Sequence, residues 1–126
     1  MDYKTINSLA LAYMGDAIYE VYVREYLIKN NIVKVNELQK EAIKYVSAKN
    51  QALILKDMIS NNYLEEEELN IVYRARNHKS HTSKNADIVT YKYSTGLEAL
   101  IGYLYFSDKK TRIDDIMNYI FTRRGE

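Results

Sequence analysis

The stretch "LALAYMGDAIYEVYVREYL", residues 9–27, decides the fold that we predict for this chain. Its apolar residues recur at helical spacing, and we expect one long helix from about Ser8 to Lys29. Gly15 and Asp16 stand together inside it, although glycine costs a helix interior up to about 1 kcal/mol and aspartate competes for backbone hydrogen bonds. Local preferences of this kind are often broken at functional sites. Two interpretations stay open: a close helix contact beside a solvated acid, or a functional site.

The rest of the chain also has the periodicity of helices joined by short polar loops. It contains no proline and four glycines, so it has few helix breakers. Five further helices are expected. Three of them begin at Asn36, after Ser47 and within residues 65–68. The last two cover residues 93–106 and residues 111–124. Asn36 and Gln39 fit a capping box, and Ser47 fits an N-cap. Residues 86–93 could pass for a strand but have no second strand to pair with, so we predict one all-α domain over residues 1–126.

Composition narrows the classes of protein that this chain can be. Its 126 residues carry 18 basic and 17 acidic side chains, so a polyanionic partner needs a local basic patch. The lack of cysteine excludes disulfides, thiolate metal sites and cysteine nucleophiles, and is typical of a reducing compartment. No apolar run reaches the roughly 18 residues of a membrane span, and no signal-peptide pattern is present. We therefore expect a cytoplasmic protein without a membrane partner.

A second candidate acid is Glu98, in "STGLEALIGYLY" at residues 94–105. Small residues flank it as they flank Asp16, so the two helices could approach closely and bring both carboxylates together. An alternative stays open, because Thr95 and Glu98 also fit a capping box at the start of their own helix. Glu20 lies one turn after Asp16 and either supports the site or only pairs with Arg24. We predict a supporting role for Glu20.

Carboxylates without neighbouring bases repel each other, and a divalent cation can neutralise them. Oxygen ligands favour Mg²⁺ or Mn²⁺, whereas two histidines three residues apart without further ligands do not indicate zinc. The segment "RARNHKSHTSKN", residues 74–85, lacks apolar periodicity and is expected to be a loop. Its basic residues suit phosphate binding, and they are Arg74, Arg76, Lys79 and Lys84. Acids for a hard cation and a basic loop together indicate metal-dependent hydrolysis of a nucleic-acid phosphodiester.

Three segments resemble the Mini-ribonuclease III (Mini-III) family, a reduced branch of the ribonuclease III class. They are residues 9–27, residues 45–52 ("YVSAKNQA") and residues 71–105 ("IVYRARNHKSHTSKNADIVTYKYSTGLEALIGYLY"). The resemblance implies an all-α ribonuclease III-like endonuclease domain that forms a homodimer and cuts double-stranded RNA with Mg²⁺, with Mn²⁺ as a possible substitute. It also implies a role in maturing the ends of the large ribosomal RNA (23S) precursor. By the same resemblance, Asp16 is the metal-binding catalytic aspartate and Glu98 is its carboxylate partner.

The chain departs from full-length ribonuclease III at two further acid positions. Ala12 and Thr95 stand there, which leaves the number of metal ions open. No double-stranded-RNA-binding domain is expected after the catalytic domain, so the segment from Arg74 to Lys84 is the predicted duplex-binding element. The expected reaction is attack of a Mg²⁺-activated water on a phosphodiester, leaving 5′-phosphate and 3′-hydroxyl ends.

Two other classes of function stay open on the sequence. One is a non-catalytic RNA-binding helical module, which would tolerate loss of Asp16. The other is an all-α nucleotide pyrophosphohydrolase, because Glu65 and Glu68 have a spacing that could hold Mg²⁺. The first helix also predicts a dimer, because it carries more aromatic surface than one small core can cover. The residues concerned are Tyr13, Tyr19, Tyr22 and Tyr26.

Overall fold

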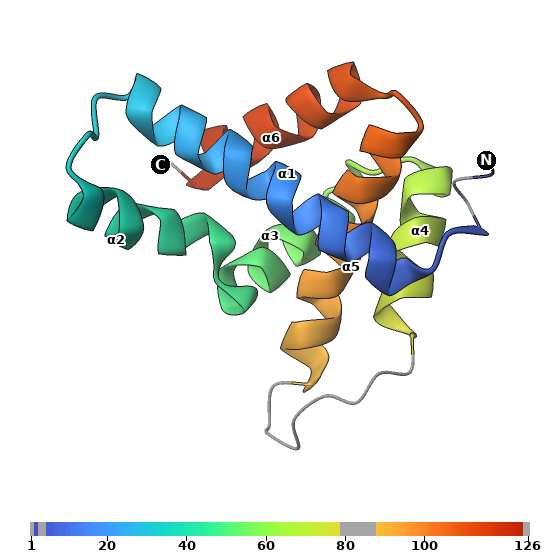
Figure 1. The fold of residues 1–126 in the computed structure, drawn as a ribbon. Coiled ribbons are helices and arrows are strands. Elements are labelled where there is room, and N and C mark those ends of the chain that lie inside the picture. Colours follow the sequence, from blue (N-terminus) through green and yellow to red (C-terminus); the bar gives the residue numbers. More distant parts are fainter. Residues whose placement is uncertain (1, 3–4, 79–87, 125–126) are drawn as a thin grey trace.

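A computed structural model describes residue 2, residues 5–78 and residues 88–124 of the chain (Figure 1). These residues form six helices and no strand: α1 (Ser8–Lys29), α2 (Val35–Val46), α3 (Ala48–Ser60), α4 (Glu66–Arg76), α5 (Ile88–Phe106) and α6 (Lys110–Arg124). The predicted all-α class is confirmed over this part of the chain, and α1 has the predicted bounds. The predicted RNA contacts Lys79 and Lys84 lie outside the described residues.

Helix α5 is the centre of the fold. It packs against α1, α3, α4 and α6, and Figure 1 shows α1 lying across it. The side chains that α5 buries without exposed surface are Leu97, Ala99, Leu100 and Ile101. A helix surrounded in this way is apolar on most of its circumference, and this explains why its sequence has little amphipathic character.

The crossing of α1 and α5 is a contact between two backbones. A Cβ atom on Gly15 would lie 1.7 Å from the carbonyl oxygen of Glu98, and one on Gly102 would lie 2.0 Å from that of Leu11. Only glycine fits at these two positions, which confirms the predicted close approach. Gly96, which we expected at the same contact, instead faces side chains of α3 and α4.

Two of the three predicted helix starts at α2, α3 and α4 are confirmed. Ser47 caps α3 as predicted, because its Oγ accepts a hydrogen bond from the Asn50 backbone 3.2 Å away. The acidic run at residues 65–68 begins α4, also as predicted. The capping box of Asn36 and Gln39 is wrong, because α2 already begins at Val35 and Asn36 therefore lies inside the helix.

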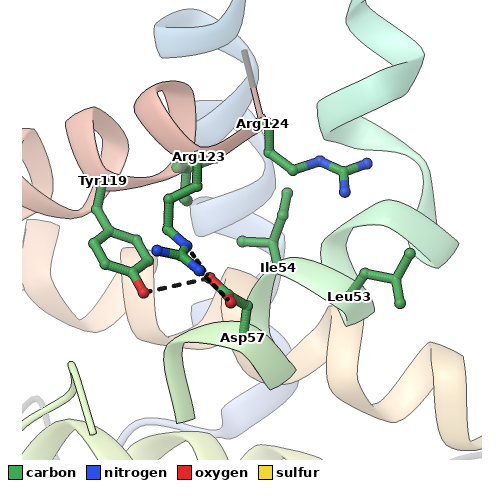
Figure 2. Close-up of a pocket in the computed structure, with 7 residues that line it drawn as sticks. Leu53, Ile54, Asp57, Tyr119, Arg123 and Arg124 are labelled. Carbon is green, nitrogen blue, oxygen red and sulfur yellow. Dashed lines mark hydrogen bonds and ion pairs between the residues drawn. The ribbon is translucent and has the colours of Figure 1, made fainter. Parts of the chain in front are cut away.

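An ion-pair network joins α3 to α6 (Figure 2). Arg123 donates hydrogen bonds of 2.5 and 3.0 Å to the two carboxylate oxygens of Asp57, and the Tyr119 hydroxyl lies 3.3 Å from one of them. Arg124 extends away from Asp57 in the figure and donates to the Asn50 side-chain oxygen over 2.6 Å. These arginines, at the border of a pocket of about 240 Å³, tie the last helix to the core.

Most of the α1 tyrosines make contacts within the chain, which we did not predict. Three of them have partners within the chain: Tyr19 donates to the Tyr45 carbonyl oxygen (2.7 Å), Tyr22 donates to Asp114 (2.6 Å), and Tyr26 stacks on Phe121 with ring centres 3.9 Å apart. Only Tyr13 is largely exposed, at 84%. The predicted surplus of aromatic surface is therefore wrong for three of the four residues, because α2 and α6 cover them.

Candidate active site

Asp16 and Glu98 line one pocket of about 260 Å³ between α1 and α5. Its lining residues are Leu9, Ala12, Tyr13, Asp16, Tyr91, Thr95 and Glu98. The backbone contact explains why the acids meet, because Asp16 follows Gly15 directly and Gly15 touches the carbonyl of Glu98. The structure thus brings together the two acids that the sequence singled out.

The two acids interact electrostatically. Burial raises the pKa of Glu98 to about 8, and a hydrogen bond with Asp16 and the charge of Asp16 act in the same direction. Neither acid forms an ion pair within the described part of the chain. At neutral pH the pair is therefore stabilised by a proton, and a divalent cation can take the place of that proton.

The donor set fits a hard cation such as Mg²⁺. Both side chains offer carboxylate oxygens, and the pocket leaves space beside them. Within residues 5–78 and 88–124 no group of three or more acidic, histidine or cysteine side chains could hold a metal ion. A cation here would thus have two protein ligands and several waters, which is a usual arrangement for Mg²⁺.

The capping-box alternative for Glu98 is wrong. Helix α5 begins at Ile88, so Thr95 lies in the helix interior, where it is buried. The Thr95 hydroxyl donates a hydrogen bond of 2.9 Å to the Tyr91 carbonyl oxygen of the preceding turn. Glu98 therefore does not cap its own helix, and its carboxylate faces α1.

Glu20 lies one turn beyond Asp16 on α1 and has a partner of its own. Its carboxylate is 3.3 Å from the Arg24 guanidinium, in the i,i+4 pair that the sequence suggested. The charge of Glu20 also raises the pKa of Glu98, by less than burial and Asp16 do. Its role in supporting the site stays a prediction.

Arg74 and Arg76 lie on α4, so their predicted position in a loop is wrong. The helix ends at Arg76 and so includes the first three residues of the predicted loop. Arg74 donates to the Ser8 hydroxyl over 3.1 Å and to the Ile6 carbonyl oxygen over 2.9 Å. It thereby ties the start of α1 to α4, while its contact with RNA stays a prediction.

Arg76 belongs to a cation–aromatic cluster formed by Lys56, Tyr73, Arg76 and Tyr93. Arg76 donates a hydrogen bond of 3.1 Å to the Tyr93 hydroxyl and lies over the ring of Tyr73. Lys56 lies 4.8 Å from the centre of the Tyr93 ring. Tyr93 stands on α5 two residues from Tyr91 and from Thr95, so its side chain leaves the helix on another side than these two lining residues of the acidic pocket. Lys56 was not predicted from the sequence.

Gln51 is a second residue that the sequence analysis missed. It is 1% exposed on α3, and the Ser94 hydroxyl donates a short hydrogen bond to its side-chain oxygen. A signal was available, because Gln51 interrupts the apolar face that Ala48, Ala52 and Leu55 form. A buried amide in such a place needs partners.

The acids proposed for a pyrophosphohydrolase are not available to a metal. Glu68 is 3% exposed, and it accepts hydrogen bonds of 2.7 and 2.8 Å from Arg112. It also accepts one from the Glu65 backbone at the start of α4. This acid is a helix cap and half of a buried ion pair.

The all-α fold agrees with what family comparison shows. Residues 9–109 match the family model described as the Ribonuclease III domain. The chain is therefore a ribonuclease III domain, a class of endoribonuclease that acts on RNA.

Relatives narrow the class to one branch. A Mini-ribonuclease 3 of Enterococcus faecalis is 48% identical over 99% of this chain and 96% of its own length, and one of Brevibacillus brevis is 52% identical over 91% and 85%. The crystal structure of a Fusobacterium nucleatum protein matches with a TM-score of 0.81 and 36% identity over 94% of this chain and 93% of that one. The chain belongs to the Mini-ribonuclease 3 family. None of its described helices has the length and hydropathy needed to cross a membrane.

Proposed function

We propose that this endoribonuclease cleaves double-stranded RNA with Mg²⁺ held by Asp16 and Glu98, and that Mn²⁺ can substitute. The observation that carries the proposal is the pair of carboxylates in one pocket without a basic partner among the described residues. When bound, the cation lowers the pKa of water and neutralises charge on the phosphate. The products are 5′-phosphate and 3′-hydroxyl ends.

The protein groups have different tasks in this reaction. Asp16 is exposed at the pocket, so it is the acid nearer to an incoming phosphodiester. Glu98 is partly buried and gives up its proton when a cation binds, because only the carboxylate is a ligand. Glu20 keeps the surroundings negative without binding the metal.

We assign duplex binding to basic residues of α3 and α4 and of the segment that follows α4. Arg76 is held by Tyr93 and Tyr73 at a fixed place, and we include Lys56 with it. The other predicted contacts with RNA are Arg74, Lys79 and Lys84, of which Lys79 and Lys84 lie outside the described residues. Because A-form RNA presents phosphates and 2′-hydroxyls across a shallow groove, recognition depends mainly on shape.

A homodimer completes the proposed enzyme. An apolar groove of about 380 Å³ is lined by Met14, Ala17, Ile18, Val21, Tyr22, Tyr105, Lys110 and Ile113. Val21 is 61% exposed, and it lies one and two turns from Ala17 and Tyr13 on the same face of α1. A second copy covering this face would place two acidic pockets near each other, one for each strand.

The biological substrate that we propose is the precursor of 23S ribosomal RNA, in the cytoplasm. This part rests on the family, whose members are named Mini-ribonuclease 3, and on the lack of cysteine in the chain. A test is to incubate a precursor stem with the protein and map the ends. Cuts at the mature ends are expected, whereas dispersed cuts would contradict this substrate.

The activity itself is tested on long duplex RNA with chelator, Mg²⁺, Mn²⁺ or Ca²⁺. We expect cleavage with Mg²⁺ and Mn²⁺ and none with chelator, and a 5′-phosphate-dependent exonuclease should degrade the products. Single-stranded RNA of the same sequence is the control. Intact duplex RNA that remains bound in Mg²⁺ would instead favour the non-catalytic module.

The dimer is tested by sedimentation of the protein and of Val21→Glu. The variant should sediment as a monomer and lose cleavage. In its dimer, the new glutamate at position 21 and Glu20 of both subunits would bring four negative charges together at the contact. Glu25→Gln, at the far end of α1, is the matched control. An active monomer would contradict the proposed dimer.

A further inference from the structure

Gln51 carries a hydrogen-bonding group that the fold does not use. Its side-chain oxygen accepts from Ser94, whereas its side-chain nitrogen Nε2 is buried and has no hydrogen-bond partner among the described residues. A buried donor without a partner destabilises the folded protein, because it has lost its hydrogen bonds to water. Such a group usually has an acceptor, which can be a ligand, a water molecule or a neighbouring side chain in another orientation.

The place of Ser94 on α5 indicates the missing partner. Ser94 and Glu98 lie one turn apart on the same side of α5, at i and i+4. Since Ser94 holds the oxygen of the Gln51 amide, the nitrogen of that amide is the end left for a second acceptor. Gln51 also counteracts the raised pKa of Glu98 through its side chain, so the amide stabilises the carboxylate form.

We propose that Gln51 is a positioning residue: its Nε2 donates to one carboxylate oxygen of Glu98 and leaves the other oxygen for the divalent cation. The inference rests on the proposed function, because it gives Glu98 the role of ligand. A two-carboxylate site needs such a group, since a long glutamate side chain otherwise has several orientations. Hydrogen bonds that orient a metal ligand typically change metal affinity 10–100-fold.

A purely structural role for Gln51 makes a different prediction. In that case the amide only joins α3 to α5 through Ser94, and removing either partner has the same consequence. Ser94→Ala removes this tie and leaves Nε2 in place, whereas Gln51→Met keeps the side-chain length and removes the donor. The pair of variants therefore separates the tie from the donor.

The test measures Mn²⁺ binding to the full chain without RNA, from the electron paramagnetic resonance signal of free Mn²⁺. We expect Gln51→Met to weaken binding about 10–100-fold, and Ser94→Ala, which frees the amide but keeps its donor, to weaken binding clearly less than Gln51→Met does. Equal affinities of Gln51→Met and the parent, or equal losses in both variants, would overturn the inference. If the parent itself binds no Mn²⁺, or if Asp16→Asn binds it as well as the parent, the proposed function fails instead.

A second measurement needs no Gln51 variant. The chain contains two glutamines, Gln39 and Gln51, so selective ¹⁵N-glutamine labelling gives two side-chain amide signals. Gln39 is exposed on α2, and Gln39→Glu identifies its signal. The Gln51 amide signal should shift on titration with Mg²⁺ while that of Gln39 stays in place. An unmoved Gln51 signal at saturating Mg²⁺ would overturn the inference.

Discussion

Two acidic regions of this protein differ in what neutralises them. Glu68 on α4 lies against Arg112, and Asp57 on α3 lies against Arg123, each within 3.0 Å of its base. Asp16 and Glu98 have no basic partner among the described residues, and burial raises the pKa of Glu98 to about 8. The comparison teaches that acids paired with a base belong to the fold, and that the unpaired acids are the ones available for chemistry.

The largest effect is expected for Asp16→Asn. The variant keeps the shape of the side chain and loses the charge that holds the cation, so single-turnover cleavage should fall about a thousandfold, or about 4 kcal/mol. Binding of duplex RNA should persist, as measured by filter binding in Ca²⁺. Asp57→Asn is the matched control and should lower stability without slowing cleavage. Cleavage by Asp16→Asn at nearly the parental rate would mean that Asp16, like Asp57, is not needed for catalysis.

Glu68→Gln should act on the fold alone. The substitution leaves Arg112 without its counter-charge in a partly buried place, so the free energy of unfolding should fall by about 2–3 kcal/mol. Urea unfolding measures this loss, and cleavage below the unfolding transition should keep its parental rate. A stable variant that no longer cleaves would mean that Glu68 belongs to the active site.

The pH dependence of stability distinguishes the regions further. Glu98 has its pKa raised from 4.5 to about 8, so between these values the folded protein holds a proton that the unfolded chain releases. The stability from this proton is present below about pH 4.5 and is lost as the pH rises towards 8. The melting temperature of the metal-free protein should therefore decrease from pH 5 to 8 relative to Glu98→Gln. Parallel curves for both proteins would show that Glu98 is not protonated in the fold.

The smallest effect is expected for Arg76→Ala. Loss of one phosphate contact should reduce the slope of log K against log salt by somewhat less than one unit. Cleavage at saturating protein should continue, because Arg76 does not hold the cation. Lys29→Ala, which removes a base paired with Glu25 at the end of α1, should leave the slope unchanged. An unchanged slope in Arg76→Ala would exclude this residue from the interface.

Local patterns sufficed to predict α1 and its close contact with the helix that carries Glu98. The bounds of α1 follow from apolar periodicity that ends in a polar segment, and Gly15 and Gly102 reveal a close crossing because glycine is poor in helices for any other purpose. These inferences need no knowledge of the remaining chain. They therefore held when the helices were placed together.

Distant partners explain what could not be predicted. Thr95 and Glu98 have the spacing of a capping box, and only the start of α5 at Ile88 decides that they do not form one. Arg74 looked like a loop cation because its acceptor on Ile6 lies far away in the sequence. The same holds for Gln51, whose partner Ser94 stands on another helix.

The glycine crossing of α1 and α5 also bears on when the enzyme becomes active during synthesis. Asp16 is near the beginning of the chain and Glu98 near its end, and they meet only when Gly15 touches the backbone at Glu98. Closing so long a loop comes late in folding, because its entropy must be overcome before the contact forms. A nascent chain still on the ribosome therefore has no assembled pair of carboxylates until α5 has emerged.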